Sequence, residues 1–272
     1  MNMNELVRLG GLPRSKLPSI DTTCNTAPSY FEAFADLNIE HLIHQRNHAV
    51  ESAADYRRKF EAIGRFSVSS PGTSDAPIHP SRTGLSKSGA MIYGRLMYYS
   101  KRTCSIVGVV YWEFTYAAPA EFLNAPPCWL LIEKPEFWPK GIEDWTRGFD
   151  HRLKTFLRAM RACEDKAIQK GRLKEDQRLS GPMQQSWESG YCWIIYAVLH
   201  SFAFDAIYWQ KIHPRFFGPT ESPEEAWKDR LGLVDEKEKY EMEQLVARKL
   251  EEMKTRDLAW DQMSILWPLV SR

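Results

Sequence analysis

The segment IEDWTRGFDHRLKTFLRAMRACEDKA, residues 142–167, decides the fold class. Apolar side chains recur through it at steps of four and three, and such steps keep them on one face of an α-helix. The members of this stripe are Phe149, Leu153, Phe156, Met160, Cys163 and Ala167. The segment therefore predicts a helix with one side toward a core, and everything from Ile142 onward reads as helical.

Further helices are marked by their start signals. Ser29 with Glu32 forms a capping box, and a second helix is expected from Ser52 to about Ala62. SPEE at 222–225 and Asp235 with Glu238 mark two later starts. The last helix is expected to bury one apolar face: Tyr240, Leu245, Val246, Leu250 and Met253.

One stretch interrupts the helical pattern. The β-branched run SIVGVVYWEF, residues 105–114, predicts a buried strand, and a proline-rich loop follows it. The aromatic side chains of that loop are expected to pack: Phe122, Trp129, Phe137 and Trp138. The predicted fold is α+β and mainly α, with a short strand pair near residues 105–114.

Composition narrows the class of protein. Lys and Arg number 36 against 35 Asp and Glu, and a net charge of +1 argues against a dedicated nucleic-acid binder. Five scattered cysteines and the lack of a signal-peptide pattern predict reduced thiols in a cytoplasmic protein. The most apolar segment, Cys192–Trp209, contains His200, Ser201 and Asp205, so a buried helix is expected rather than a membrane span.

Three histidines form the one metal-like constellation. His41, His44 and His48 fall on roughly one helical face, where three imidazoles could hold a metal ion. No cysteine or carboxylate completes an obvious fourth ligand, so solvated or packed histidines are the alternative. The chain has no GxSxG, HExxH, Walker or GxGxxG motif.

A family resemblance rests on IVGVVYWEFTYAAPAE, residues 106–121. It resembles the strand and proline-bearing turn of the aminoglycoside phosphotransferase, or choline-kinase-like, family in a fungal-type branch, where the pattern reads V-x-G-V-I-D-W-E-F. The likeness continues through WLLIEKPEFWPKGIEDW, FDHRLKTFLRAMRACED and HSFAFDAIYWQKIHPRFFG. The resemblance implies the helical C-lobe of a protein-kinase-like fold and transfer of phosphate from ATP to a small-molecule hydroxyl.

The residues required for phosphoryl transfer can be compared with this sequence one by one. Phosphoryl transfer takes a phosphate loop with its lysine, a catalytic Asp, and carboxylate and amide ligands for magnesium. Tyr111 occupies the magnesium-Asp position of the family pattern, and a phenol does not replace a carboxylate there. Trp112 and Glu113 are the motif remnant. The family's N-lobe and its catalytic loop, D-D-L/F-R-P-x-N-V-L, are both missing, so no catalytic or metal site is expected intact and no cofactor is expected to bind.

The missing loop has a counterpart in another reading frame. When Ala90–Ser100 is back-translated and read from the third base of each codon, the sequence permits D-D-L-R-P-S-N-V-L. Three of those positions are fixed by the code, namely the second Asp, the Val and the Leu. We therefore hypothesise that about 63–105 is out of frame through a frameshift or a mis-called intron, with a genuine irregular insertion as the alternative.

The predicted organisation has four parts. Residues 1–28 are a linker after the missing N-lobe, 29–62 are C-lobe helices, 63–105 are irregular, and 106–272 are the C-lobe strand and helices. Three readings remain: a phosphotransferase active only with a corrected sequence, a non-catalytic helical binding module or pseudoenzyme, and a histidine metal binder. A small-molecule acceptor is implied by the family, with no nucleic acid or membrane partner, while the acceptor's identity and the oligomeric state stay open.

Overall fold

The computed structural model describes residues 7, 11–19, 21–22, 24, 27–45, 50–68, 90–92, 98–100, 106–109, 115–117, 120–200, 203–220, 222, 225–232 and 234–255. These residues are mainly helical, as the sequence predicts. They form two compact units. The first contains residues 1–24, 28–77 and 196–272, and the second contains 25–27 and 78–195.

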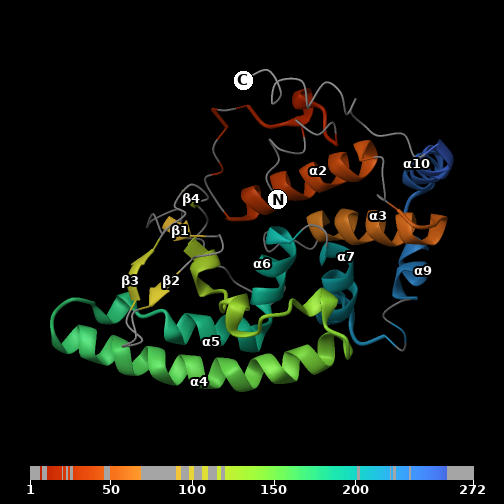
Figure 1. Cartoon of the computed structure of the whole chain (residues 1–272). Coiled ribbons are helices and arrows are strands. Elements are labelled where there is room, and N and C mark those ends of the chain that lie inside the picture. Colours follow the sequence, from red (N-terminus) through yellow and green to blue (C-terminus); the bar gives the residue numbers. More distant parts are fainter. Residues whose placement is uncertain are drawn as a thin grey trace. The chain divides into compact units, whose positions relative to one another are not determined.

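The second unit is built around the long helix α4, Gly141–Gln169 (Figure 1). α5, Ser180–Ser189, packs beside it, and α6, Tyr191–Leu199, follows after the left-handed Gly190. An aromatic cluster joins these helices, with ring centroids 4.5–5.8 Å apart: Trp145, Phe149, Trp187 and Trp193. The apolar stripe of α4 thus meets partners that are themselves aromatic, which makes this cluster the core of the unit.

Short elements precede α4 in the chain. In the part of the chain that the structure describes, four strands form two antiparallel pairs, β1 (Ala90–Ile92) with β4 (Thr115–Ala117) and β2 (Tyr98–Ser100) with β3 (Ile106–Val109). The two strands nearest to residues 105–114 therefore pair with residues 90–100 and not with each other. Three 3-10 helices then lead into α4: η3 (Ala120–Asn124), η4 (Cys128–Leu130) and η5 (Pro135–Phe137). A fourth, η6 (Glu175–Gln177), joins α4 to α5.

The first unit is helical in all its described elements. It opens with the 3-10 helix η1 (Arg14–Lys16) and α2 (Ala27–His44), and α3 (Ala53–Val68) runs beyond the predicted end at Ala62. α3 packs against three later helices, α7 (Phe204–Ile207), α9 (Ala226–Leu231) and α10 (Glu236–Thr255). The π-helix η8 (Tyr208–Ile212) and α8 (His213–Phe217) follow α7.

The predicted apolar stripe of α4 is correct at its start and wrong toward its end. Phe149 and Leu153 are buried, but Cys163 is exposed and Glu164 is buried in its place. The buried row advances in steps of four after Leu153, so it reaches Leu157 and moves off the predicted line. The Glu164 carboxylate accepts hydrogen bonds from the backbone N–H groups of Leu179 and Ser180, which begin α5.

Other expectations have mixed outcomes. Asp235 does begin α10, because its Oδ1 accepts the backbone N–H of Glu238 at 2.8 Å. Tyr240, however, is 66% exposed, and Lys249 takes a buried position on the same helix. The apolar segment Cys192–Trp209 is largely buried as expected, yet it is divided among α6, α7 and η8 and is not one helix. Across the described residues, none of the helices combines the length and the apolar character needed to cross a membrane.

Candidate functional site

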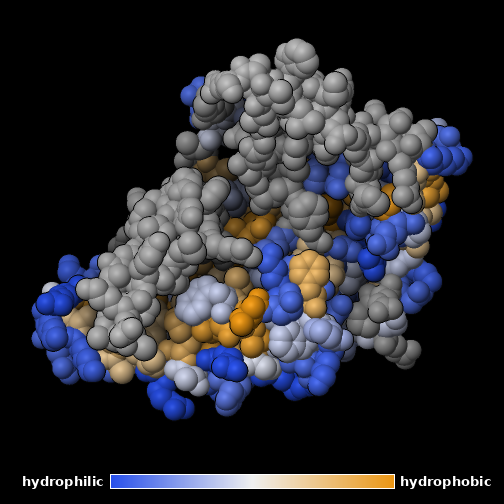
Figure 2. Space-filling view, in the orientation of Figure 1, coloured by the Kyte–Doolittle hydropathy of each residue, from blue (hydrophilic) through white to orange (hydrophobic). Residues whose placement is uncertain are grey.

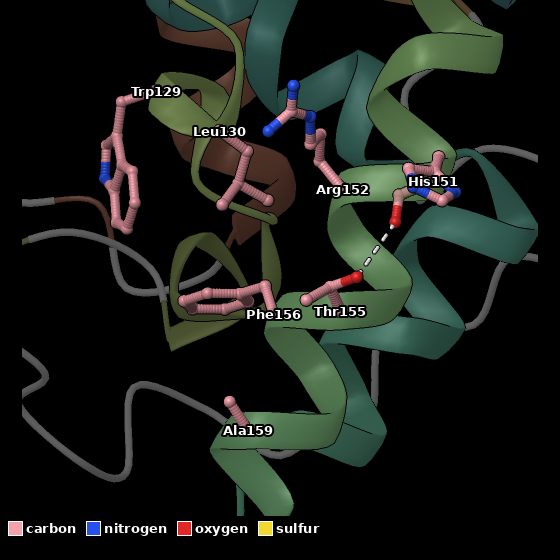
Figure 3. A pocket seen from close by; sticks show the side chains of 7 residues that line it. All are labelled: Trp129, Leu130, His151, Arg152, Thr155, Phe156 and Ala159. Carbon is pink, nitrogen blue, oxygen red and sulfur yellow. Dashed lines mark hydrogen bonds between the residues drawn. The ribbon is translucent and has the colours of Figure 1, made fainter.

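A cavity of about 650 Å³ opens between η4 and α4 in the second unit. Trp129 and Leu130 line it from η4, and one face of α4 supplies the rest: His151, Arg152, Thr155, Phe156 and Ala159. Figure 3 shows these side chains, with Trp129 and Phe156 on the apolar side and the Arg152 guanidinium extended toward Leu130. The Trp129 and Phe156 rings meet edge to face, with centroids 5.9 Å apart.

The loop that carries Trp129 is fastened to α4 by two indole groups. The Trp145 Nε1–H donates to the Glu133 carbonyl at 2.9 Å, and the Trp138 Nε1–H donates to Asp144 at 2.8 Å. The hydrogen bond from Trp138, with a second from Arg147, holds the pKa of Asp144 below its ordinary value. The loop approaches α4 closely at Gly148, where an added Cβ would lie 3.8 Å from a methyl group of Leu131. These contacts hold the η4 side of the cavity against the helix.

The charge on α4 is distributed unevenly around the cavity. Asp150 pairs with Lys154 at 2.7 Å, and the hydrogen bond from Lys154 lowers the pKa of that carboxyl. The Arg152 guanidinium makes no hydrogen bond or ion pair with any residue that the structure describes. The positions three and four residues away on the helix hold no acid, so the sequence itself leaves this cation without a helical partner.

The aromatic side chains of the loop divide into two kinds. Phe122 is fully buried, as expected, and Trp138 is held by its bond to Asp144. The other two are not buried: Trp129 is 57% exposed although its ring contacts Phe156, and Phe137 is 66% exposed. Ile132 between them is also fully exposed. Apolar colour accordingly appears on the surface beside α4 in Figure 2.

The polar side chains of the cavity lining are few. Its lining provides one guanidinium, one imidazole and one hydroxyl among apolar walls. The Thr155 hydroxyl donates to the His151 carbonyl at 3.5 Å, along the helix. A nucleophile needs an oriented base within hydrogen-bond reach, and the lining holds no such pair.

The site residues predicted from sequence lie elsewhere. Tyr111, Trp112 and Glu113 fall outside the described residues, as does His48. His41 is buried, and burial together with the nearby Lys249 ammonium lowers its pKa to about 4. Among the described residues, which do not include His48, no group of three or more potential metal ligands lies together. The Nδ1 of His44 instead lies 2.8 Å from the Glu40 carbonyl oxygen.

A second polar cluster is enclosed in the first unit. His213 is wholly buried, and its Nε2 accepts the Arg230 Nε–H at 2.9 Å. The ring centroids of Trp209 and Phe217 lie 5.0 and 4.9 Å from that of His213, and the Arg230 guanidinium lies 4.2 Å from the Phe217 centroid. Burial, with the Arg230 charge, lowers the pKa of His213 to about 4. Only one side of this cluster is exposed, at Phe217, which is 39% exposed.

The cavity residues were not singled out from the sequence. Phe156 was assigned to the core stripe, and Trp129 was expected to pack. A partial signal in the sequence is Arg152, an arginine without an acid three or four residues away on the helix, a feature that Arg158 shares. Comparisons of the chain with protein-family models, with curated proteins and with solved structures gave no match.

Proposed function

We propose that this chain is an aminoglycoside phosphotransferase-like protein by descent that binds an organic molecule or partner and does not transfer phosphate. The descent is supported by the residues 106–121 and the segments that resemble the family around them. The lack of catalysis is supported by Tyr111 at the magnesium-Asp position and by the lack of the catalytic-loop pattern before Ile106. Losing such groups removes interactions that matter chiefly in the transition state.

One observation carries the binding function. Five large apolar side chains are strongly exposed among the described residues, and three of them lie in the single segment 129–137. This segment borders the cavity through Trp129. Clustered apolar exposure beside a cavity of several hundred Å³ is typical of a ligand or partner site, whereas scattered apolar residues are ordinary.

The test of binding uses the neutral dye Nile red, whose fluorescence rises in apolar surroundings. We expect saturable binding to the intact chain and a loss of at least fivefold in affinity for Trp129→Ala and Phe137→Ala. Tyr240→Ala is the matched control, because Tyr240 is as exposed as Phe137 but lies on α10 of the other unit. Equal binding by all four proteins would show that segment 129–137 is not the site.

The test of catalysis is separate. We expect no rise in melting temperature with magnesium and ATP, since a ligand stabilises a fold only if it binds the native state. We also expect no transfer of labelled γ-phosphate to a panel of aminoglycosides, choline and sugars. A dose-dependent rise, or any acceptor-dependent transfer, would show that a nucleotide site works despite Tyr111 and would make the chain an enzyme.

A further inference from the structure

The charge of Arg152 sets the chemistry of the cavity. Its neighbours at three and four residues along α4 are Gly148, Phe149, Thr155 and Phe156, and none is acidic. Arg147 and Lys154 on α4 do pair over those distances, with Asp144 and Asp150. Arg158 also lacks an acid at those positions, but it does not line the cavity. A guanidinium that has no partner and lies beside apolar side chains can bind an anionic group of a ligand.

The apolar side chains of the lining indicate which kind of molecule would carry the anionic group. Trp129, Leu130 and Phe156 present apolar surface, and Figure 3 shows the Arg152 guanidinium on the side of Leu130. The Trp129 and Phe156 rings already contact each other edge to face, so a ligand would lie against them and not between them. Flat apolar groups suit such a surface because they bury area at a low cost in conformational entropy.

We propose that this cavity binds a small organic carboxylate with a flat apolar body. The carboxylate would pair with the two parallel N–H groups of Arg152, and the body would lie against Trp129 and Phe156. This inference rests on the proposed binding function and names its ligand class. A monoanion is favoured over a phosphate because Arg152 is the one permanently charged side chain in the lining, whereas a phosphate usually gathers several donors.

The experiment is a calorimetric titration with 2-naphthoate and its neutral analogue 2-naphthamide, which share one apolar body. We expect 2-naphthoate to bind about two- to fivefold more tightly, the range for a charge pair made by an exposed guanidinium. Arg152→Met should abolish that preference and leave the weak binding of the amide. Arg158→Met is the matched control, because Arg158 is exposed on α4 but does not line the cavity; it should keep the preference.

The results distinguish a failure of the carboxylate inference from a failure of the proposed binding function. Equal binding of 2-naphthoate and 2-naphthamide to the intact chain would overturn the carboxylate while keeping an apolar site. A preference that survives Arg152→Met would place the anion elsewhere and also overturn the inference. If neither compound binds, the ligand class is wrong, and Nile red binding to Trp129→Ala then decides independently whether the proposed function stands. Arg152 is exposed, so its replacement is expected to leave folding intact, which a melting curve verifies.

Discussion

Acid should destabilise the first unit through His213. The imidazole is fully buried, its Nε2 accepts the Arg230 Nε–H, and its Nδ1 has no hydrogen-bond partner among the described residues. Protonation would remove the acceptor and place a second positive charge beside Arg230. The folded state therefore resists protonation, and the pKa of His213 falls to about 4 from an ordinary value near 6.5.

The sign and size follow from proton linkage. Between pH 6.5 and pH 4 the unfolded chain binds a proton that the folded chain does not, so the free energy of unfolding decreases as the pH falls. For a shift of this size the decrease is about 2–3 kcal/mol by pH 4.5. His41 is also buried with a pKa lowered to about 4, so it should contribute a similar decrease in the same unit.

The assay is urea unfolding of the intact chain and His213→Gln at pH 7.0, 5.5 and 4.5. Glutamine keeps an acceptor for Arg230 but does not titrate, so the variant should lose about half as much stability as the intact chain between pH 7.0 and 4.5. His151→Gln, on an exposed face of α4, is the control and should follow the intact chain. If the free energy of unfolding falls equally with pH in the intact chain and in His213→Gln, the argument is refuted.

Three further predictions test other parts of the chain. Glu164→Ala should lower the free energy of unfolding by about 1–3 kcal/mol, because it removes the acceptor for the backbone N–H groups at the start of α5. The control Asp165→Ala should change the free energy of unfolding by less than about 1 kcal/mol. Chemical denaturation measures both. Lys249→Met should cost about 2–4 kcal/mol because its buried ammonium bonds a backbone carbonyl and a carboxylate, whereas the exposed Lys254→Met should be nearly neutral in the same assay. Sequencing the transcript across residues 63–105 should give a reading frame that encodes D-D-L-R-P-S-N-V-L, and an in-frame read of the residues as written would contradict the frameshift hypothesis.

Helix existence was predictable because it depends on local patterns. The periodic run in α4 and the Asp235 cap of α10 are both visible in the sequence and present in the structure. Side-chain burial was less predictable because it depends on distant partners. Lys249 is buried since its ammonium donates to the Gln45 carbonyl, more than two hundred residues away, and no local pattern signals such a bond.

Glu164 shows the same limit within one unit. Helical periodicity predicts Cys163 as a core residue, and glutamate is seldom buried without a partner. Burial raises the pKa of Glu164, but hydrogen bonds from Ser180 and Leu179 outweigh that effect and hold the pKa below its ordinary value. A carboxylate that stays charged while buried needs such donors, and they become visible only when α5 is placed beside α4.

The candidate site was hard to predict for a related reason. A catalytic centre is recognised in a sequence by residue types at fixed spacing, and Tyr111 departs from the phosphotransferase pattern that residues 106–121 resemble. A binding surface is indicated instead by apolar side chains that stay exposed and by charged side chains that lack an ionic partner. Trp129 is exposed although it is a large aromatic residue, and Arg152 lacks an acidic neighbour on its helix. The first fact requires the structure. The second is readable from the sequence, but Arg158 on the same helix also lacks an acidic neighbour, so only the structure shows which of the two cations lies beside apolar side chains.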